Sequence, residues 1–480
     1  MIDKKIRLEN ISPEVGNENQ SDQFVDIENP SPKKNKNPEI TPLLASLEEE
    51  LNSWSELSGE HCIYKVPERL RTAGNESLYN PKVVSIGPIH HEREGLEAME
   101  EYKKRFLKDF LARLKVKFAD YAQFMQGREE KLRNSYAYEG VGHLKSDKLT
   151  KIFMVDAAFL VELLLRNSLL KAQDDKSCSR VKPLDFKSSS DVKPLDFKSC
   201  RIFGRPKMLI DIQRDVILVE NQLPMFILEE IFDTFISPEV DVISLVCEFV
   251  SSDRDGASKP DLESVQRSNP VHFLDCLRSC YIFECNDAGE VPKPRDRAPV
   301  KHPYIHSVSE LHEAGLDFKK SESSNLFSIK YEDGLLRLPY MPIGSASEMI
   351  YRNLLAFEQC HYLPSERIFT DFFRLMDQLV NTPQDIDLLV ENEIIRRTLG
   401  ESSAAADVFN RISHGLQTCY DQNHFADIYR ELKAYYDRPW NRWKATLKHK
   451  YFHNPWAIIS VVAAAILLIL TIIQTVFSIL

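Results

Sequence analysis

The stretch from Trp456 to Leu480 contains no charged residue and limits what the chain can fold into more than any other. As an α-helix it measures roughly 37 Å, and the hydrocarbon core of a bilayer is roughly 30 Å thick. A buried helix of a soluble protein normally keeps a polar stripe, whereas the few polar residues here are scattered around the axis. The segment predicts one transmembrane helix over residues 456–480, with Leu467 near its middle.

The residues before this segment predict its orientation. Aromatic side chains, which favour the headgroup layer, and basic side chains are concentrated in a stem over residues 440–455 and just before it. The basic residues are Arg438, Arg442, Lys444, Lys448 and Lys450. By the positive-inside rule they keep the preceding body cytoplasmic. We therefore expect a single-pass tail anchor in the plasma membrane or an endomembrane, with the lipid bilayer as a partner.

Composition limits the class of protein. The 480 residues are 43% hydrophobic and 28% charged, which is typical of a globular body, and a mean hydropathy of -0.32 excludes a multi-span transporter. A net charge of -11 argues against nucleic acid as the main partner. The 9 cysteines are dispersed and odd in number, which favours reduced thiols. Because the start has no apolar signal segment, a body outside the cell would require unconventional secretion.

Changes in composition predict the domain boundaries. Residues 1–42 are polar and predict a disordered tail, followed by a helical domain over 43–439. Two segments of that domain read as flexible insertions, near 172–205 and 286–302. In the first of them the octet VKPLDFKS occurs twice, and the second is rich in Pro, Asp and Lys.

Two of the helices predicted in the first half of the chain have a clear hydrophobic pattern. The run Lys151–Leu170 is apolar nearly all round and predicts a central core helix. A second membrane span is less favourable, because Asp156 and Glu162 would lie in lipid at a cost of several kcal/mol. Between Phe106 and Met125, apolar residues recur every three or four positions and predict one helix. Its other face is basic and favours a solvated surface over contact with anionic lipid or calmodulin. The basic residues are Lys103, Lys104, Arg105, Lys108, Arg113, Lys115 and Lys117.

The second half of the chain reads as helices with one β element. Residues Leu326–Ile343 alternate around Asp333-Gly334, which predicts a hairpin. Ser307–Gly315 predicts a short helix, and helical patterns return from Ser347, including one through DIDLLVENEIIRRTLG. The predicted fold is mainly α: a multi-helix globular body with a minor β-hairpin and one C-terminal transmembrane helix.

Candidate chemical groups are few. Cys276, Cys280 and Cys285, followed by His302 and His306, superficially resemble a metal set. The sequence has no CxxC pair, however, and a cysteine in an apolar helical run is more often a small buried hydrophobe. The prediction is no metal site.

Acid–base candidates are equally weak. His90 and His91 follow Gly-Pro in a loop, and Glu220 and Glu358 could form a carboxylate pair, although capping explains each of them. We find no GxSxG elbow, phosphate-binding loop, dinucleotide fingerprint or kinase signature. The prediction is therefore no catalytic residue and no cofactor, and these four residues are the candidates if an unrecognised active site exists.

Several ordered stretches together resemble one family. They are YKVPERLR at Tyr64, YNPKVVSIGPIHH at Tyr79, MVDAAFLVELLL at Met154, RDVILVENQLPMFILEEIF at Arg214, SELHEAGLDF at Ser309, NLLAFEQC at Asn353 and YFHNPWAIISVVAAAILLILT at Tyr451. This series is similar to the plant domain of unknown function 247 family, also called the UPF0481 type. At Ala157-Ala158 the chain departs from the family's usual Asp-Gly-Cys-Phe.

The resemblance implies a role in interaction. Members of the family are plant-specific, are membrane-attached by a C-terminal segment, and in some grasses are linked to pollen and stigma self-recognition. It implies a protein-interaction, signalling or recognition component with an unknown protein partner, and leaves a small-molecule ligand undetermined. The alternative is an enzyme with an unrecognised active site in the helical body.

Overall fold

The computed structural model describes most of the chain after the N-terminal region. The described residues are 44–47, 61–71, 75–174, 200, 202–252, 259–284, 292, 304–397, 400–439 and 455–479. The chain divides into two compact units, Met1–Ser58 and Gly59–Leu480. In the first unit, residues 44–47 are helical and exposed. The predicted tail (1–42), the stem apart from Pro455, and most of the two predicted insertions lie outside the described residues; of the insertions, residues 172–174, 200, 202–205 and 292 are described.

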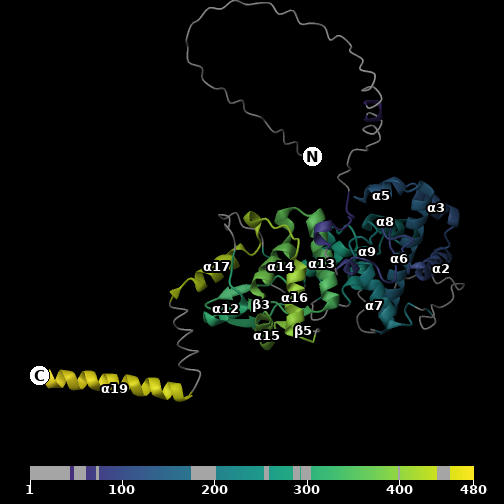
Figure 1. The fold of residues 1–480 in the computed structure, drawn as a ribbon. Helices are drawn as coiled ribbons and strands as arrows, with labels where there is room; N and C mark the ends of the chain where they lie inside the picture. The colour runs from purple at the N-terminus through teal and green to yellow at the C-terminus, as the bar shows by residue number, and fades with distance from the viewer. Residues whose placement is uncertain are drawn as a thin grey trace, which may run out of the picture. The chain divides into compact units, whose positions relative to one another are not determined.

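The first half of the second unit is helical (Figure 1). Its α-helices are α2 (Glu97–Leu114), α3 (Phe118–Gln126), α4 (Glu129–Asn134), α5 (Glu139–Gly142), α6 (Ser146–Asp174), α7 (Pro206–Asp215), α8 (Met225–Ile231), α9 (Val242–Val250), α10 (Leu262–Arg267) and α11 (Phe273–Ile282). Two short 3-10 turns, η1 (Glu68–Leu70) and η2 (Glu76–Leu78), precede them, and a π-helical turn, η3 (Phe232–Ile236), follows α8.

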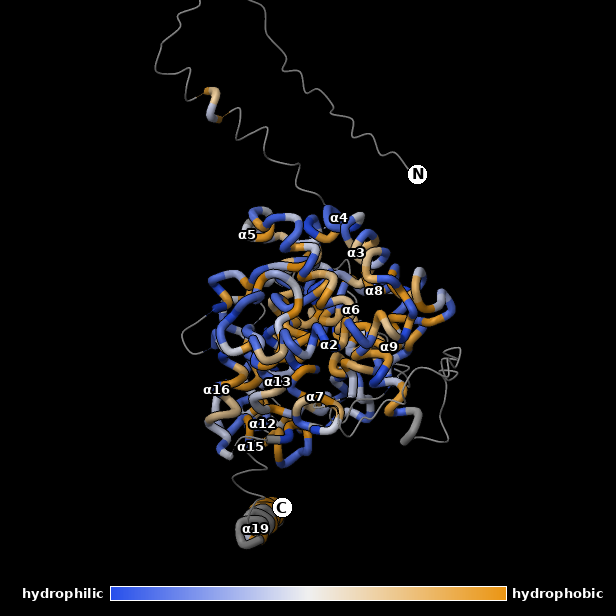
Figure 2. Tube along the Cα trace, turned by 90° about the vertical axis from the view of Figure 1, so that its right-hand side faces the viewer, coloured by the Kyte–Doolittle hydropathy of each residue, from blue (hydrophilic) through white to orange (hydrophobic). Residues whose placement is uncertain are grey.

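The predicted core helix is confirmed as α6, which packs against α2, α3 and α9. Hydrophobic residues gather around α6 and α9 (Figure 2). Two acids of α6, Asp156 and Glu162, are also buried, and each has a cation from α2. Lys103 Nζ lies 2.5 Å from Asp156 Oδ1, and Arg113 Nε lies 2.7 Å from Glu162 Oε1. Because a buried charge is tolerated only when it is paired, these two contacts allow α6 to occupy the core.

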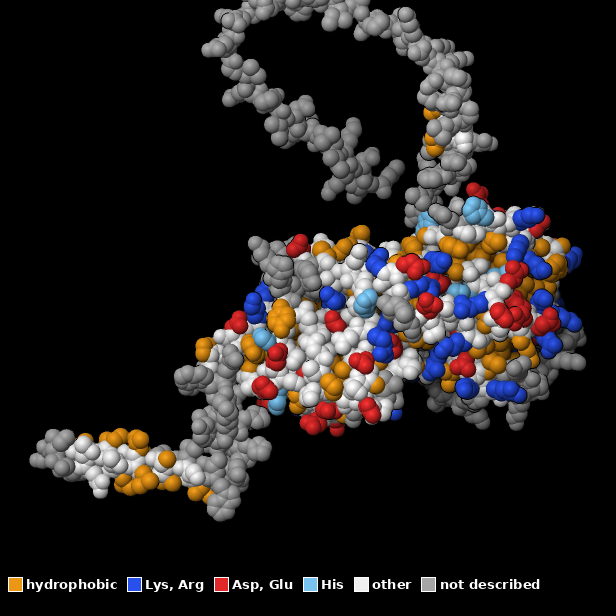
Figure 3. All heavy atoms as spheres, viewed as in Figure 1, with side chains coloured by type: hydrophobic (Ala, Val, Ile, Leu, Met, Phe, Trp, Pro, Cys, Tyr) orange, Lys and Arg blue, Asp and Glu red, His pale blue; other side chains and the backbone are white. Residues whose placement is uncertain are grey.

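The predicted single helix over 106–125 is wrong, because the chain forms α2 and α3 with a break between them. Lys115 adopts the left-handed conformation (φ 55°) and ends α2, so the helical ladder stops there. The solvated basic face is confirmed only in part, since Lys103 is buried and Arg113 is largely buried on α6. On the face drawn in Figure 3, the Lys and Arg side chains that stay exposed are interspersed with acidic ones.

The second half of the unit combines helices with two small sheets. Its helices are α12 (Val308–Glu313), α13 (Ser345–His361), α14 (Ile368–Leu379), α15 (Pro383–Glu391), α16 (Ser402–Ser413) and α17 (Ala426–Tyr436), with the 3-10 turns η4 (Pro364–Glu366) and η5 (Tyr420–Gln422). Its strands are β1 (Asp317–Lys320), β2 (Lys330–Glu332), β3 (Leu335–Leu338), β4 (Met341–Ile343) and β5 (Ile395–Arg397). Helix α13 contacts α11, α14 and α16, so it connects the two halves of the unit.

The predicted hairpin is confirmed as β2 and β3, joined through Asp333 (φ 43°) and Gly334 (φ 88°). Strand β1 adds in parallel to the other edge of β3, giving the order β1-β3-β2. Strand β4 pairs in parallel with β5, with Met341 opposite Ile395. The helix predicted through residues 385–400 is therefore wrong beyond Glu391, because the next apolar residues form β5 instead.

The C-terminal helix α19 covers Pro455–Ile479, but it does not bear out the transmembrane prediction. Over the described residues, no helix combines the length and the apolar character needed to cross a membrane. The predicted transmembrane helix, tail anchor, membrane localisation and lipid partner are corrected accordingly. The side chains of Trp456 and Leu480 lie outside the described residues.

The basic residues predicted to flank that helix are described only at one position. Arg438 is exposed beyond the end of α17. The other four, Arg442, Lys444, Lys448 and Lys450, fall outside the part of the chain that the structure describes.

Candidate functional site

The polar triplet Glu220-Asn221-Gln222 lies between α7 and α8, and all three side chains are buried. Glu220 Oε1 accepts hydrogen bonds from the Val66 amide at 2.7 Å and from Arg71 Nη2 at 2.6 Å. These bonds hold the segment Cys62–Arg71, which contains η1, against the helical body. The sequence indicated only a capping role for Glu220. In the structure its carboxylate accepts a hydrogen bond from the Val66 amide, 154 residues earlier in the chain.

Two of the four predicted acid–base candidates meet at this triplet. His90 Nε2 lies 3.2 Å from Glu220 Oε2, an ion-pair distance without the alignment of a hydrogen bond. Burial raises the pKa of Glu220, but the neighbouring His90 and Arg71 outweigh it and bring that pKa below its usual value. Glu220 therefore stays ionised and is a weak proton acceptor at neutral pH. The imidazole and carboxylate form a buried electrostatic contact.

The segment that follows is held in the same way by Asn221 of the triplet and by Asp215, which sequence reasoning missed. Asp215 accepts hydrogen bonds from three successive backbone amides, those of Lys82, Val83 and Val84. Asn221 Oδ1 accepts from the Ile86 amide at 2.7 Å, while its Nδ2 donates to the Val84 carbonyl at 3.0 Å. The side chains of Asp215 and Asn221 thus form the hydrogen bonds that the backbone of residues 82–86 would otherwise form with a neighbouring strand.

His91 differs from His90. Its side chain is half-buried and lies 4.0 Å from Glu92 Oε1, and burial, which outweighs the neighbouring acids, lowers its pKa. The structure therefore brings His90, but not His91, into contact with Glu220.

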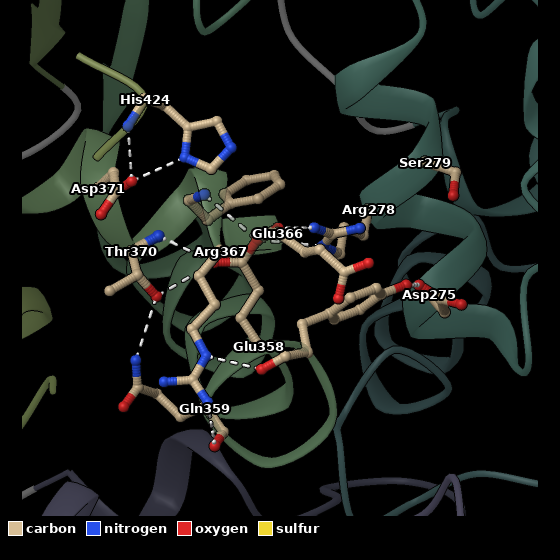
Figure 4. A network of polar contacts seen from close by, with 12 residues as sticks. Asp275, Arg278, Ser279, Glu358, Gln359, Glu366, Arg367, Thr370, Asp371 and His424 are labelled. Carbon is tan, nitrogen blue, oxygen red and sulfur yellow. Dashed lines mark hydrogen bonds and ion pairs between the residues drawn. The ribbon is translucent and has the colours of Figure 1, made fainter. Parts of the chain in front are cut away.

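Glu358, the fourth candidate, lies in a separate network (Figure 4). Its Oε1 accepts hydrogen bonds from Arg278 Nε at 3.1 Å and from the Phe369 amide at 3.2 Å. Its Oε2 accepts from the amide and hydroxyl of Thr370, at 2.9 and 3.1 Å. The carboxylate therefore caps the first turn of α14, as the sequence suggested, and binds a different set of donors from Glu220.

Arg278 is the cation of this network and joins α11 to the loop after α13. Its Nη2 donates to the Glu366 carbonyl at 2.6 Å, and its guanidinium lies 3.7 Å from the centre of the Tyr362 ring. The Tyr362 hydroxyl in turn donates to Asp275 at 2.6 Å. Tyr362 is therefore fixed at both its face and its hydroxyl.

The surface beside Tyr362 contains aromatic residues from distant parts of the chain. The Tyr64 hydroxyl lies 3.0 Å from His361 Nδ1, and the His361 ring stacks on Phe357 with centroids 5.0 Å apart. Leu363 follows with 66% of its surface exposed. We call Tyr64, His361, Tyr362 and Leu363 the Tyr64–Leu363 surface.

The cysteines assemble differently from the set that the sequence suggested. Cys276 and Cys280 lie one turn apart on α11, and the sulfur atom of Cys247 on α9 lies close to theirs. Cys285 and His302 lie outside the described residues, and His306 pairs with Glu310 and stacks on Tyr436. Sequence reasoning missed Cys247, which is 29 residues from Cys276 and belongs to no motif.

His272 links these networks to the Cys62–Arg71 segment. As the N-cap of α11, its Nδ1 accepts a hydrogen bond from the Asp275 amide, and its Nε2 lies 3.1 Å from the Cys62 carbonyl. Since Nδ1 accepts, Nε2 carries the proton, and the ring is neutral. Burial lowers the pKa of His272 to about 4.

Acidification is expected to lower the free energy of unfolding through His272 by about 3 kcal/mol between pH 7 and pH 4. Its pKa is lower in the folded chain than in the unfolded chain, where it is near 6.5. The contribution is therefore complete above pH 6.5 and is lost as the pH falls toward 4. The check is urea unfolding of the wild type and of His272→Asn, which can cap but cannot titrate. An identical pH dependence in the two proteins would contradict the prediction.

Comparison with known proteins gives a family and distant relatives. The DUF247 model, described as a plant protein of unknown function, matches residues 63–470. "UPF0481 protein At3g47200" of Arabidopsis thaliana is 24% identical over 444 residues, which cover 87% of this chain and 86% of the relative. "Putative UPF0481 protein At3g02645" of the same plant is 22% identical, covering 86% and 89%. No solved structure matches.

Proposed function

Since the chain belongs to the plant DUF247 family, whose function is unknown, we propose that it acts as a protein-interaction or recognition component. The observation that carries this proposal is the Tyr64–Leu363 surface. There an exposed leucine lies beside aromatic side chains that are already held in place. Binding at such a surface loses little side-chain entropy, because the rings are ordered before the partner arrives.

The contacts of the acid–base candidates support the same proposal. Glu220 and Glu358 are buried, and each accepts hydrogen bonds from backbone amides and from an arginine. Groups bound in this way stabilise loops and are poorly placed to exchange protons with a substrate. Glu220 instead holds the segment that supplies Tyr64, and Glu358, through Arg278, holds the loop that contains Leu363.

The chemistry of the surface indicates the chemistry of the partner. Its exposed charges are mixed, with Lys65, Glu68 and Arg69 on the segment that supplies Tyr64 and Glu366 just after Leu363. A partner segment with one large apolar side chain, which would pack on Leu363, and polar residues around it would match this surface.

Replacing Leu363 with Asp is expected to weaken partner binding by roughly tenfold or more, as is usual for the loss of an apolar residue central to an interface. A photo-crosslinking amino acid at position 363 of the full chain, expressed in plant cells, identifies the bound protein by mass spectrometry. The binding of that protein to the wild type and to the variant is then compared.

The matched control is position 118. Phe118 is also a large exposed hydrophobic residue, 60% exposed, but it lies at the start of α3. A specific crosslink at 363 but not at 118, with binding lost in Leu363→Asp and kept in Phe118→Asp, supports the proposal. No specific crosslink at 363, or equal loss of binding in two variants that unfold like the wild type, would contradict it.

A further inference from the structure

We propose that Cys247, Cys276 and Cys280 form a binding site for a thiophilic monovalent metal ion, Cu(I). The three sulfur atoms lie within 4.8 Å of one another, and the Sγ atoms of Cys247 and Cys276 are 3.2 Å apart. This inference is independent of the proposed interaction function.

Two packed helices build this cluster. Cys276 and Cys280 are four residues apart and therefore lie on one face of α11. Cys247 is on α9, which packs against α11. A metal bound at about 2.3 Å by three sulfurs requires the sulfurs to be about 4 Å apart. The Cys247–Cys276 separation of 3.2 Å is shorter than this, and all three sulfurs lie within 4.8 Å of one another, so small side-chain rotations are sufficient.

The number and softness of the ligands indicate which metal the site would take. Thiolates select Cu(I), Zn(II) and iron–sulfur clusters among the biological metals. Structural zinc sites are almost always four-coordinate. Within the described residues, the group of His, Cys, Asp and Glu side chains that can share one ion here has three members. Three sulfurs suit Cu(I) better than Zn(II).

The surroundings also favour a soft ion of low charge. All three cysteines are buried, and the Ser251 Oγ lies 3.9 Å from Cys280 Sγ. A hard cation would lose its water shell here, and three sulfurs are poor ligands for such an ion. Cu(I) forms largely covalent bonds to sulfur and loses less on burial.

Binding is coupled to the release of protons. Each thiol that becomes a thiolate ligand must release its proton to solvent, while the copper remains Cu(I). Affinity is therefore expected to increase as the pH rises.

The test is titration of the full, reduced chain with Cu(I) under anaerobic conditions, in competition with a Cu(I) chelator. We expect one tightly held equivalent, seen by native mass spectrometry, with about three sulfurs at about 2.3 Å in X-ray absorption. Cys280→Ser and Cys247→Ser should each weaken binding at least a hundredfold. The matched control is Cys360→Ser, a partly buried cysteine outside the cluster, which should bind like the wild type.

Three results would overturn the proposal. One is copper binding that is unchanged in both cluster variants. Another is retention of Zn(II) in preference to Cu(I). The third is a Cys247–Cys276 disulfide in the chain as isolated, since that bond would consume two of the three ligands. Should either variant fail to fold, an increase in the thermal midpoint of the wild type on adding one equivalent of Cu(I), absent with Zn(II), supports the site, and no increase contradicts it.

Discussion

Replacing Lys103 with Met is expected to lower the free energy of unfolding by about 3–5 kcal/mol, which is the usual cost of leaving one member of a buried ion pair alone. The ammonium group is fully buried and contacts Asp156, Glu100 and the Ser85 carbonyl. Burial by itself would lower the pKa of Lys103, but the two carboxylates outweigh it and raise the pKa. The lysine is therefore charged when folded, and its loss leaves the Asp156 carboxylate uncompensated in the core.

The control for this prediction is the adjacent residue. Lys104 is exposed and pairs with the exposed Glu101, so Lys104→Met should change the free energy of unfolding by no more than about 0.5 kcal/mol. The double variant Lys103→Met, Asp156→Asn should recover part of the loss, because the buried charge is gone. Denaturant unfolding measures all three. Equal stability of the two lysine variants would refute a structural ion pair.

A similarly large effect is expected at Glu358. Changing it to Gln should cost about 3–5 kcal/mol of unfolding free energy, because Arg278 loses its buried counter-ion. In Gln an amide NH2 group also replaces one carboxylate oxygen, and this group cannot accept a hydrogen bond from the start of α14. Thermal and denaturant unfolding check this result.

Glu366→Gln is the comparison for Glu358→Gln. Its exposed side chain accepts a hydrogen bond from the Leu363 amide, an arrangement that Gln can reproduce, so we expect a change within about 0.5 kcal/mol. A Glu358→Gln variant with wild-type stability would remove the capping and ion-pair role and would make a chemical role for this carboxylate worth testing.

The parts of the fold that sequence predicted correctly are those with a local signal. The apolar run of α6, the Asp333-Gly334 turn and the short helix α12 each depend on residues a few positions apart. In α12, Ser307 and Glu310 form the capping box that such a pattern favours. The series of ordered motifs also identified the family correctly, since the DUF247 model matches residues 63–470.

The parts that sequence did not predict depend on distant partners or on unusual backbone. Lys115 is not a glycine, so nothing in its identity marked the left-handed residue that separates α2 from α3. Strand β5 exists because β4, more than 50 residues earlier, offers it an edge. Periodicity alone placed Lys103 on a solvated face, whereas in the structure its side chain is buried and pairs with Asp156 of α6. For the candidate site, sequence identified Glu220 and Glu358 as caps and left their arginine partners unidentified.

The Cys62–Arg71 segment also has a consequence for how the protein is made. It binds Glu220 and His272, and near Arg69 it meets Gly415, where a Cβ atom would lie only 2.2 Å from the Arg69 carbonyl oxygen. A ribosome adding 5–20 residues per second reaches Gly415 roughly 20 to 70 s after Arg69. During that interval the Cys62–Arg71 segment has been synthesised but Gly415 has not, so the contact between them forms only after residue 415 has left the ribosome.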